Sequence, residues 1–194
     1  MIRNTVTAFF IILILAVGAL AGMPTDKGNM FIAGGLSFTK SGGDLYKDNS
    51  GDTPTTFSIY PEFYYFIRDR VAIGGNLGYT KISQGDNNSA TDFSLGFGAK
   101  YYFRINQQTT EIKGALLPYC SGRLMYTKET YGDDYKRTGF DIDFAGGGVY
   151  MLSDCVGAFG EIDFSINSRN PNNGDSKSGT QFGFLIGITY FIVK

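Results

Sequence analysis

The stretch DFSLGFGAKYYF, residues 92–103, decides the fold of this chain. Phenylalanine, leucine, alanine and tyrosine occupy every second position, and most of the residues between them are small or polar. Because successive side chains of a strand point to opposite faces, this pattern predicts a β-strand with one apolar face. A helix would repeat its apolar positions every three or four residues, and this stretch does not.

The same alternation recurs along the rest of the chain. It predicts seven further strands, near residues 29–39, 57–65, 71–79, 117–127, 140–150, 156–167 and 182–192. The composition agrees, because 17 phenylalanines and 13 tyrosines favour strands, and 27 glycines argue against helices. Eight strands in chain order predict an all-β fold, an eight-stranded antiparallel up-and-down β-barrel.

The connections between these segments alternate in length. Tight turns are expected at residues 68–70 and 152–154, and residues 104–115 form a longer polar connection. Long polar loops are expected at residues 40–54, 83–91, 128–138 and 168–179. Long loops at one end and tight turns at the other are typical of an outer-membrane barrel, with the long loops extracellular.

A soluble lipocalin-like barrel would also alternate, with its apolar face inside. The position of the aromatic residues favours the transmembrane barrel instead. They gather where the second, fourth, sixth and eighth strands end, which is a single rim of an up-and-down barrel. The sequence therefore predicts a periplasmic aromatic girdle of Phe63, Tyr65, Tyr101, Phe103, Tyr150 and Tyr190.

The polar face also favours a membrane barrel, because it mixes glycine and serine with charges of both signs. We expect these charges to form a network in the lumen: Glu62, Lys100, Arg123, Asp141, Asp143, Glu161 and Asp163. A three-residue turn at 152–154 would place Asp143 opposite Asp163 and Ala145 opposite Glu161. This register predicts a cluster of Arg123, Asp143 and Asp163, with Lys100 and Glu161 lower in the lumen. Five acids face two bases, so some acid is hydrated, protonated or cation-bound.

The N-terminal residues have the features of a secretory signal peptide. Arg3 supplies a positive charge, residues 8–20 are apolar, and Ala19-Leu20-Ala21 forms a small-x-small cleavage site. An N-terminal membrane anchor is the alternative, but the run is short for about 30 Å of hydrocarbon. We expect residues 1–21 to be a signal peptide and residues 22–194 to form the barrel domain.

The hairpin YYFIRDRVAIG, residues 64–74, resembles those of the small outer-membrane β-barrel family. This family includes the transmembrane domain of outer membrane protein A and the opacity-type surface proteins. Pro118-Tyr119 and Glu161 also match positions often seen in the family. The resemblance covers residues 28–194 and implies a location in outer-membrane lipid with lipopolysaccharide. It also implies insertion by the barrel assembly machinery, although this chain ends in FIVK rather than in an aromatic residue.

The chain offers little catalytic chemistry. It contains no histidine, which excludes a Ser-His-Asp triad, and its two cysteines are too few for a typical zinc site. Gly146-Gly147-Gly148 lacks the helix and the Lys-Ser/Thr of a phosphate loop. The lumen carboxylates could be read as an acid/base pair, but a structural network is favoured. We expect no catalytic, cofactor-binding or metal-binding residues, and the net charge of −1 argues against nucleic acid as a partner.

Cys120 and Cys155 fall on strands separated by one other strand. Two strand spacings, about 9–10 Å, exceed the reach of a disulfide, so free thiols are favoured over a bridge. The predicted protein is a monomeric, non-enzymatic outer-membrane barrel with a structural or adhesion-like role through its extracellular loops. Two alternatives remain, a small pore or carrier for ions or apolar solutes and a soluble periplasmic lipocalin-like binding barrel.

Overall fold

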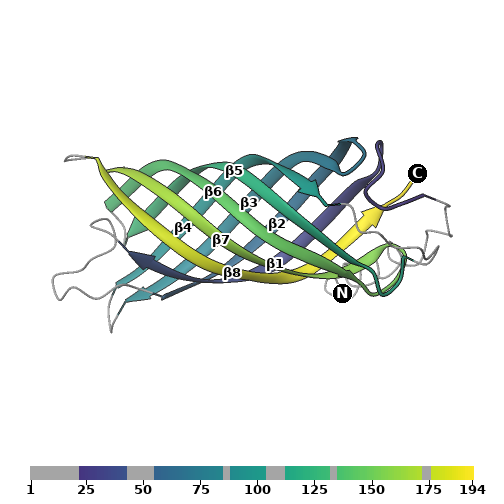
Figure 1. Cartoon of the computed structure of the whole chain (residues 1–194). Coiled ribbons are helices and arrows are strands. Elements are labelled where there is room, and N and C mark those ends of the chain that lie inside the picture. The colour runs from purple at the N-terminus through teal and green to yellow at the C-terminus, as the bar shows by residue number, and fades with distance from the viewer. Residues whose placement is uncertain (1–21, 43–54, 85–87, 104–111, 132–134, 172–175) are drawn as a thin grey trace, which may run out of the picture.

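The computed structural model describes residues 22–42, 55–84, 88–103, 112–131, 135–171 and 176–194 as a closed antiparallel barrel in chain order (Figure 1). Its strands are β1 Met30–Gly42, β2 Thr55–Arg68, β3 Val71–Gln84, β4 Asn88–Tyr102, β5 Leu116–Tyr131, β6 Tyr135–Met151, β7 Val156–Pro171 and β8 Lys177–Ile192. The predicted eight-stranded fold is confirmed. We call the end where β1 begins and β8 ends the terminal end, and the opposite end the distal end.

The strands are strongly tilted, as Figure 1 shows. Starting at Phe31 on β1 and stepping from partner to partner around the barrel leads back to β1 at Ser41. The barrel therefore closes with a stagger of ten residues (41 − 31) over eight strands. Such a stagger requires tilted strands and an interior just wide enough for side chains.

The two faces of each strand have opposite chemistry. Large apolar side chains point outward, and Phe97 is 67% exposed and Leu95 is 54% exposed. The carboxylates of the strands point inward, and Glu62 is 3% exposed and Glu161 is 1% exposed. This arrangement is the reverse of a soluble barrel and confirms the predicted transmembrane assignment of the faces.

The prediction of long distal loops is wrong for three of the four connections. The antiparallel ladders continue to Gln84 and Asn88, to Tyr131 and Tyr135, and to Arg169 and Lys177. Most of the predicted loops 83–91, 128–138 and 168–179 are therefore strand. Backbone pairing continues beyond the apolar band. Polar residues occupy both faces of the strands there, so the sequence shows no alternation of apolar and polar residues that would predict a strand. The connection 43–54 lies outside the described residues.

Residues 22–29 form hydrogen bonds with the β2–β3 turn and with the C-terminal residue at the terminal end. The amide of Arg70 donates to the carbonyl of Thr25 (2.7 Å), and the amide of Lys27 donates to Asp69 Oδ1 (2.9 Å). The amide of Lys194 donates to Asn29 Oδ1 (3.1 Å). The described part of the chain contains no helix long and apolar enough to cross a membrane.

Candidate functional site

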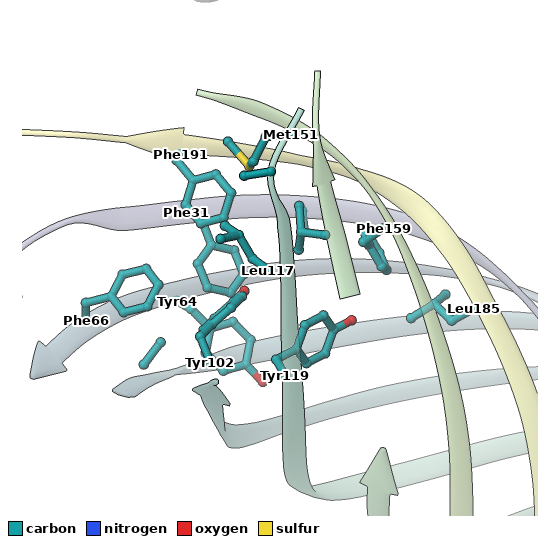
Figure 2. Close-up of a cluster of buried hydrophobic side chains, with 14 residues drawn as sticks. Phe31, Tyr64, Phe66, Tyr102, Leu117, Tyr119, Met151, Phe159, Leu185 and Phe191 are labelled. Atoms are coloured by element: carbon teal, nitrogen blue, oxygen red, sulfur yellow. The ribbon is translucent and has the colours of Figure 1, made fainter. Parts of the chain in front are cut away.

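The lumen near the terminal end is filled by a plug of packed aromatic and aliphatic side chains (Figure 2). The ring of Phe31 stacks on Tyr64 at a centroid distance of 5.0 Å and meets Tyr102 edge-on at 6.3 Å. The plug comprises Phe31, Ala33, Tyr64, Phe66, Ala72, Tyr102, Ala115, Leu117, Tyr119, Val149, Met151, Phe159, Leu185 and Phe191, all buried. Sequence reasoning missed this plug and expected a polar lumen. Aromatic residues at inward positions, such as Tyr64 and Tyr102, were the available signal.

Gly74 leaves room for the plug, because a Cβ atom there would lie 2.6 Å from Tyr64 Cγ and closer still to the carbonyl of Phe63. We expect Gly74→Ala to lower the free energy of unfolding by about 1–3 kcal/mol through overpacking. Gly34→Ala is the matched control, since nothing lies within 4 Å of a Cβ atom at Gly34. Urea unfolding of both variants in lipid vesicles checks this expectation, and equal midpoints for the two variants would contradict it.

Beyond the plug lies a layer of buried ion pairs, which we call the middle cluster. Lys100 Nζ lies 2.7 Å from Glu62 Oε2 and 3.7 Å from Glu161 Oε2. Arg123 Nη1 lies 2.8 Å from Glu161 Oε1 and 3.3 Å from Glu62 Oε1, and Arg123 Nε lies 3.6 Å from Asp143 Oδ2. Two cations from neighbouring strands thus share two glutamates. This sharing compensates charges that would be costly if buried alone.

The middle cluster and the plug are in direct contact. Lys100 Nζ lies 4.8 Å from the ring centroid of Tyr119 and 5.3 Å from that of Tyr64, within the range of cation–π attraction. On the distal side of this layer is a cavity of about 30 Å³, lined in part by Asn76, Asp143 and Asp163. A space of this size accommodates about one water molecule. The described side chains therefore close the lumen at two successive levels.

The predicted partners within this cluster need correction. Residue Asp143 lies opposite Ser165, and Asp163 lies opposite Ala145, because the β6–β7 pairing begins at Met151 and Gly157 rather than after a three-residue turn. The acids are therefore displaced by two residues from the predicted register. Arg123 lies opposite Asp143 as predicted, but its shorter contacts are to Glu62 and Glu161. Asp163 lines the same cavity and makes no ion pair within the described chain.

A second layer of ion pairs, the distal cluster, lies nearer the opposite mouth of the barrel. Arg169 donates from both Nη atoms to Asp141 and from Nε to Glu129 Oε1 (2.8 Å). The hydroxyl of Thr127 donates to Asp141 (2.6 Å), and Arg137 Nε lies 3.2 Å from Glu129. Asp141 therefore belongs to this cluster and not to the group around Arg123. Sequence reasoning missed Arg169, Glu129 and Arg137 because it placed them in loops.

The six residues of the predicted girdle all lie on the outward face near the terminal end. Phe63, Tyr65, Tyr101, Phe103 and Tyr150 are exposed, and Tyr190 is half-buried. The structure also contains a second belt near the distal end, which the sequence reading did not anticipate. Each strand contributes one exposed ring to this distal belt, and the hairpin partners face each other: Phe38 and Phe57, Tyr79 and Phe93, Tyr126 and Phe140, and Phe164 and Phe182.

The spacing of the two belts fits a bilayer. On β4 the segment from Phe93 to Tyr101 has nine residues (93–101), and outer-membrane strands cross with about 9–11 tilted residues. Exposed apolar residues such as Leu95 and Phe97 fill the interval between the belts. The outer wall is therefore suited to acyl chains.

The described residues contain no group of three or more histidine, cysteine, aspartate or glutamate side chains that could hold a metal ion. The two thiols are unbridged, with Cys120 exposed on β5 and Cys155 half-buried in the turn before β7. The buried carboxylates of the middle cluster are paired with cations beneath a cavity with space for about one water molecule. This arrangement holds the buried charges in place.

No family model matches the sequence, and no curated protein matches it significantly. Several solved structures resemble it. Neisserial surface protein A superimposes with a TM-score of 0.64 at 16% identity, over 84% of this chain and 99% of that one. OprG of Pseudomonas aeruginosa gives a TM-score of 0.54 at 15% identity, over 89% and 100% of the two chains. Ail, the attachment invasion locus protein of Yersinia pestis, gives 0.51 at 14% identity, over 86% and 99%.

The chain has the fold of the small outer-membrane β-barrels. The surface of this small outer-membrane barrel indicates a location in a membrane, because an exposed apolar wall lies between two aromatic belts. Such a wall requires a bilayer, and barrels of this kind reside in the outer membrane of Gram-negative bacteria. The alternative of a soluble periplasmic barrel is therefore wrong, because the apolar face points outward and not into the lumen.

Proposed function

We propose that this outer-membrane barrel is not an enzyme and acts through its surface, in a structural or adhesion-like role. The observation that carries the proposal is the closed lumen. The plug around Phe31 and the middle cluster around Arg123 fill consecutive levels of the interior. A protein with a filled interior meets other molecules through its outer wall and its two ends.

The distal end is proposed to face the cell exterior. Outer-membrane barrels have short periplasmic turns, and the terminal end holds the tight β2–β3 and β6–β7 turns. The strands also continue past the distal belt, where the distal cluster supports them from inside. This extension would raise the distal end of the barrel above the lipid surface. The name of Ail, an attachment invasion locus protein, agrees with a role in attachment for a barrel of this fold.

Several further features belong to the same proposal. Residues 1–21 would direct export and be removed, and the barrel assembly machinery would insert residues 22–194 as a monomer. The six aromatic residues near the terminal end, including Tyr65 and Tyr101, would lie at the periplasmic interface. The seven predicted lumen charges, divided between the middle and distal regions, would fix the interior rather than conduct ions.

Conductance separates this proposal from the pore alternative. We expect the purified barrel to give no sustained channels in planar bilayers, because the cavity beyond the middle cluster is only about 30 Å³. Vesicles carrying the barrel should instead adhere to host-cell surfaces better than empty vesicles do. An open-channel porin serves as the positive control for conductance. Sustained single-channel currents from the purified protein would favour the pore and overturn the surface role.

A further inference from the structure

The exposed charges on the strands are distributed very unevenly. Among the described strand residues, every carboxylate is buried or half-buried, and the exposed charged residues are all basic. Arg68 is the one at the terminal end, and the others are lysines near the distal end: Lys40, Lys81, Lys128, Lys136 and Lys177. Among the described strand residues above the distal belt, the exposed charges are therefore all positive.

Three of these lysines belong to a repeated tripeptide, aromatic-Thr-Lys. It occurs as Phe38-Thr39-Lys40 on β1, Tyr79-Thr80-Lys81 on β3 and Tyr126-Thr127-Lys128 on β5. In each copy the aromatic ring is in the distal belt, the threonine is buried in the lumen, and the lysine is exposed. Each lysine therefore lies one outward-facing position above the belt.

The strand register also places a belt ring beside each lysine. Lys40 lies opposite Phe182, Lys81 lies opposite Phe57, and Lys128 lies opposite Phe93. A lysine in this position can lay its methylene stem along the ring and hold its ammonium in the polar layer above. We call Lys40, Lys81 and Lys128 the lysine collar.

The depth of the collar matches the head groups of the outer leaflet. Aromatic belts mark the boundary between acyl chains and head groups, so ammonium groups just above the belt lie at the level of lipid phosphates. The collar lysines are on alternate strands, about 10 Å apart around the wall. At this spacing each ammonium can meet a different phosphate, and lysine is a common phosphate ligand.

We infer that the lysine collar binds the phosphate groups of lipopolysaccharide in the outer leaflet. The inference rests on the proposed orientation, with the distal end outside. The collar would hold a fixed shell of phosphorylated glycolipid around one side of the barrel, on β1 to β5. Charge complementarity carries the argument, because phosphates are the dense anions at this depth and the exposed strand residues there carry only positive charge.

The test measures the affinity of the folded barrel, in nanodiscs of zwitterionic lipid, for fluorescent bisphosphorylated lipid A. We expect K40Q/K81Q/K128Q to weaken binding by about a hundred-fold at low salt, or about five-fold per lysine. The matched control is K27Q/K113Q/K194Q, which removes the same charge from exposed lysines at the terminal end. This control should bind within about two-fold of the unaltered barrel, and K40R/K81R/K128R should retain tight binding.

The inference would be overturned by equal losses in the collar and control variants, by undiminished binding of the collar variant, or by equal affinity for dephosphorylated lipid A. Equal affinity for phosphatidylglycerol at matched phosphate would also overturn the assignment to lipopolysaccharide. Heat-modifiable migration on gels verifies that each variant folds. If the triple variant does not fold, the single variant Lys81→Gln replaces it, with an expected loss of lipid A affinity of about five-fold. Conductance tests whether the lumen is closed, and lipid A affinity tests the collar. Failure of the surface role and failure of the collar therefore give different results.

Discussion

Replacing Arg123 with alanine should lower the free energy of unfolding by about 3–5 kcal/mol, because it removes one partner from a buried ion-pair network. Arg123 contacts Glu62, Glu161 and Asp143, and of the described cations only Lys100 would then remain beside the two glutamates. Urea unfolding of the barrel in lipid vesicles, followed by tyrosine fluorescence or gel mobility, measures the change. An unchanged urea midpoint would show that Arg123 does not stabilise the lumen.

A double-mutant cycle separates loss of the ion pair from loss of packing. Removing a negative charge next to the vacated position should restore part of the stability, so Arg123→Ala combined with Glu161→Gln should be more stable than additivity predicts. Lys113→Ala is the control for loss of a positive charge at an exposed position and should change stability by less than about 0.5 kcal/mol. Strict additivity in the cycle would contradict direct coupling between Arg123 and Glu161.

Phe97→Arg should destabilise the inserted barrel by about 2–4 kcal/mol, the cost of a lipid-facing arginine near the bilayer midplane. Phe97 is 67% exposed and lies midway between Phe93 of the distal belt and Tyr101 of the terminal girdle. Reversible folding into vesicles, measured by urea titration, gives the change directly. The barrel should also insert more slowly, with less heat-modifiable product at a fixed time.

Thr91→Arg is the matched control, since Thr91 is exposed on the same strand but lies beyond the distal belt. An arginine near the interface should cost about 0–1 kcal/mol. Phe97→Leu controls for loss of the ring and should cost little, because leucine is also apolar. If arginine at both positions proves equally tolerated, the assignment of this face to lipid would be wrong.

The lysine collar shows how a local sequence feature becomes interpretable only in the barrel. Aromatic-Thr-Lys is visible in the sequence at residues 38–40, 79–81 and 126–128. Its significance depends on three strands that all run toward the distal end and on a register that brings the lysines to a similar level. The same holds for the distal belt, whose rings face each other across hairpins.

The sequence by itself determined the number of strands, their order and the direction of each face. These properties are local, because alternation in a segment such as residues 92–103 follows from the two-residue period of the strand backbone. Lumen residues such as Glu62 and Arg123 could be recognised for the same reason. Polar strand extensions could not be recognised, since Glu129 and Arg169 lie in segments without apolar alternation.

Only the tertiary structure decided which inward side chains meet. The stacking of Phe31 on Tyr64 and the pairing of Arg123 with Glu161 depend on the ten-residue stagger of the closed barrel. Asp143 lies opposite Ser165 instead of Asp163 because the β6–β7 ladder begins at Met151 and Gly157. The direction of a side chain follows from its position within one strand, whereas the register between two strands depends on the length of the turn that joins them. A shift of two residues keeps every side chain on the same face but changes all of its cross-strand partners.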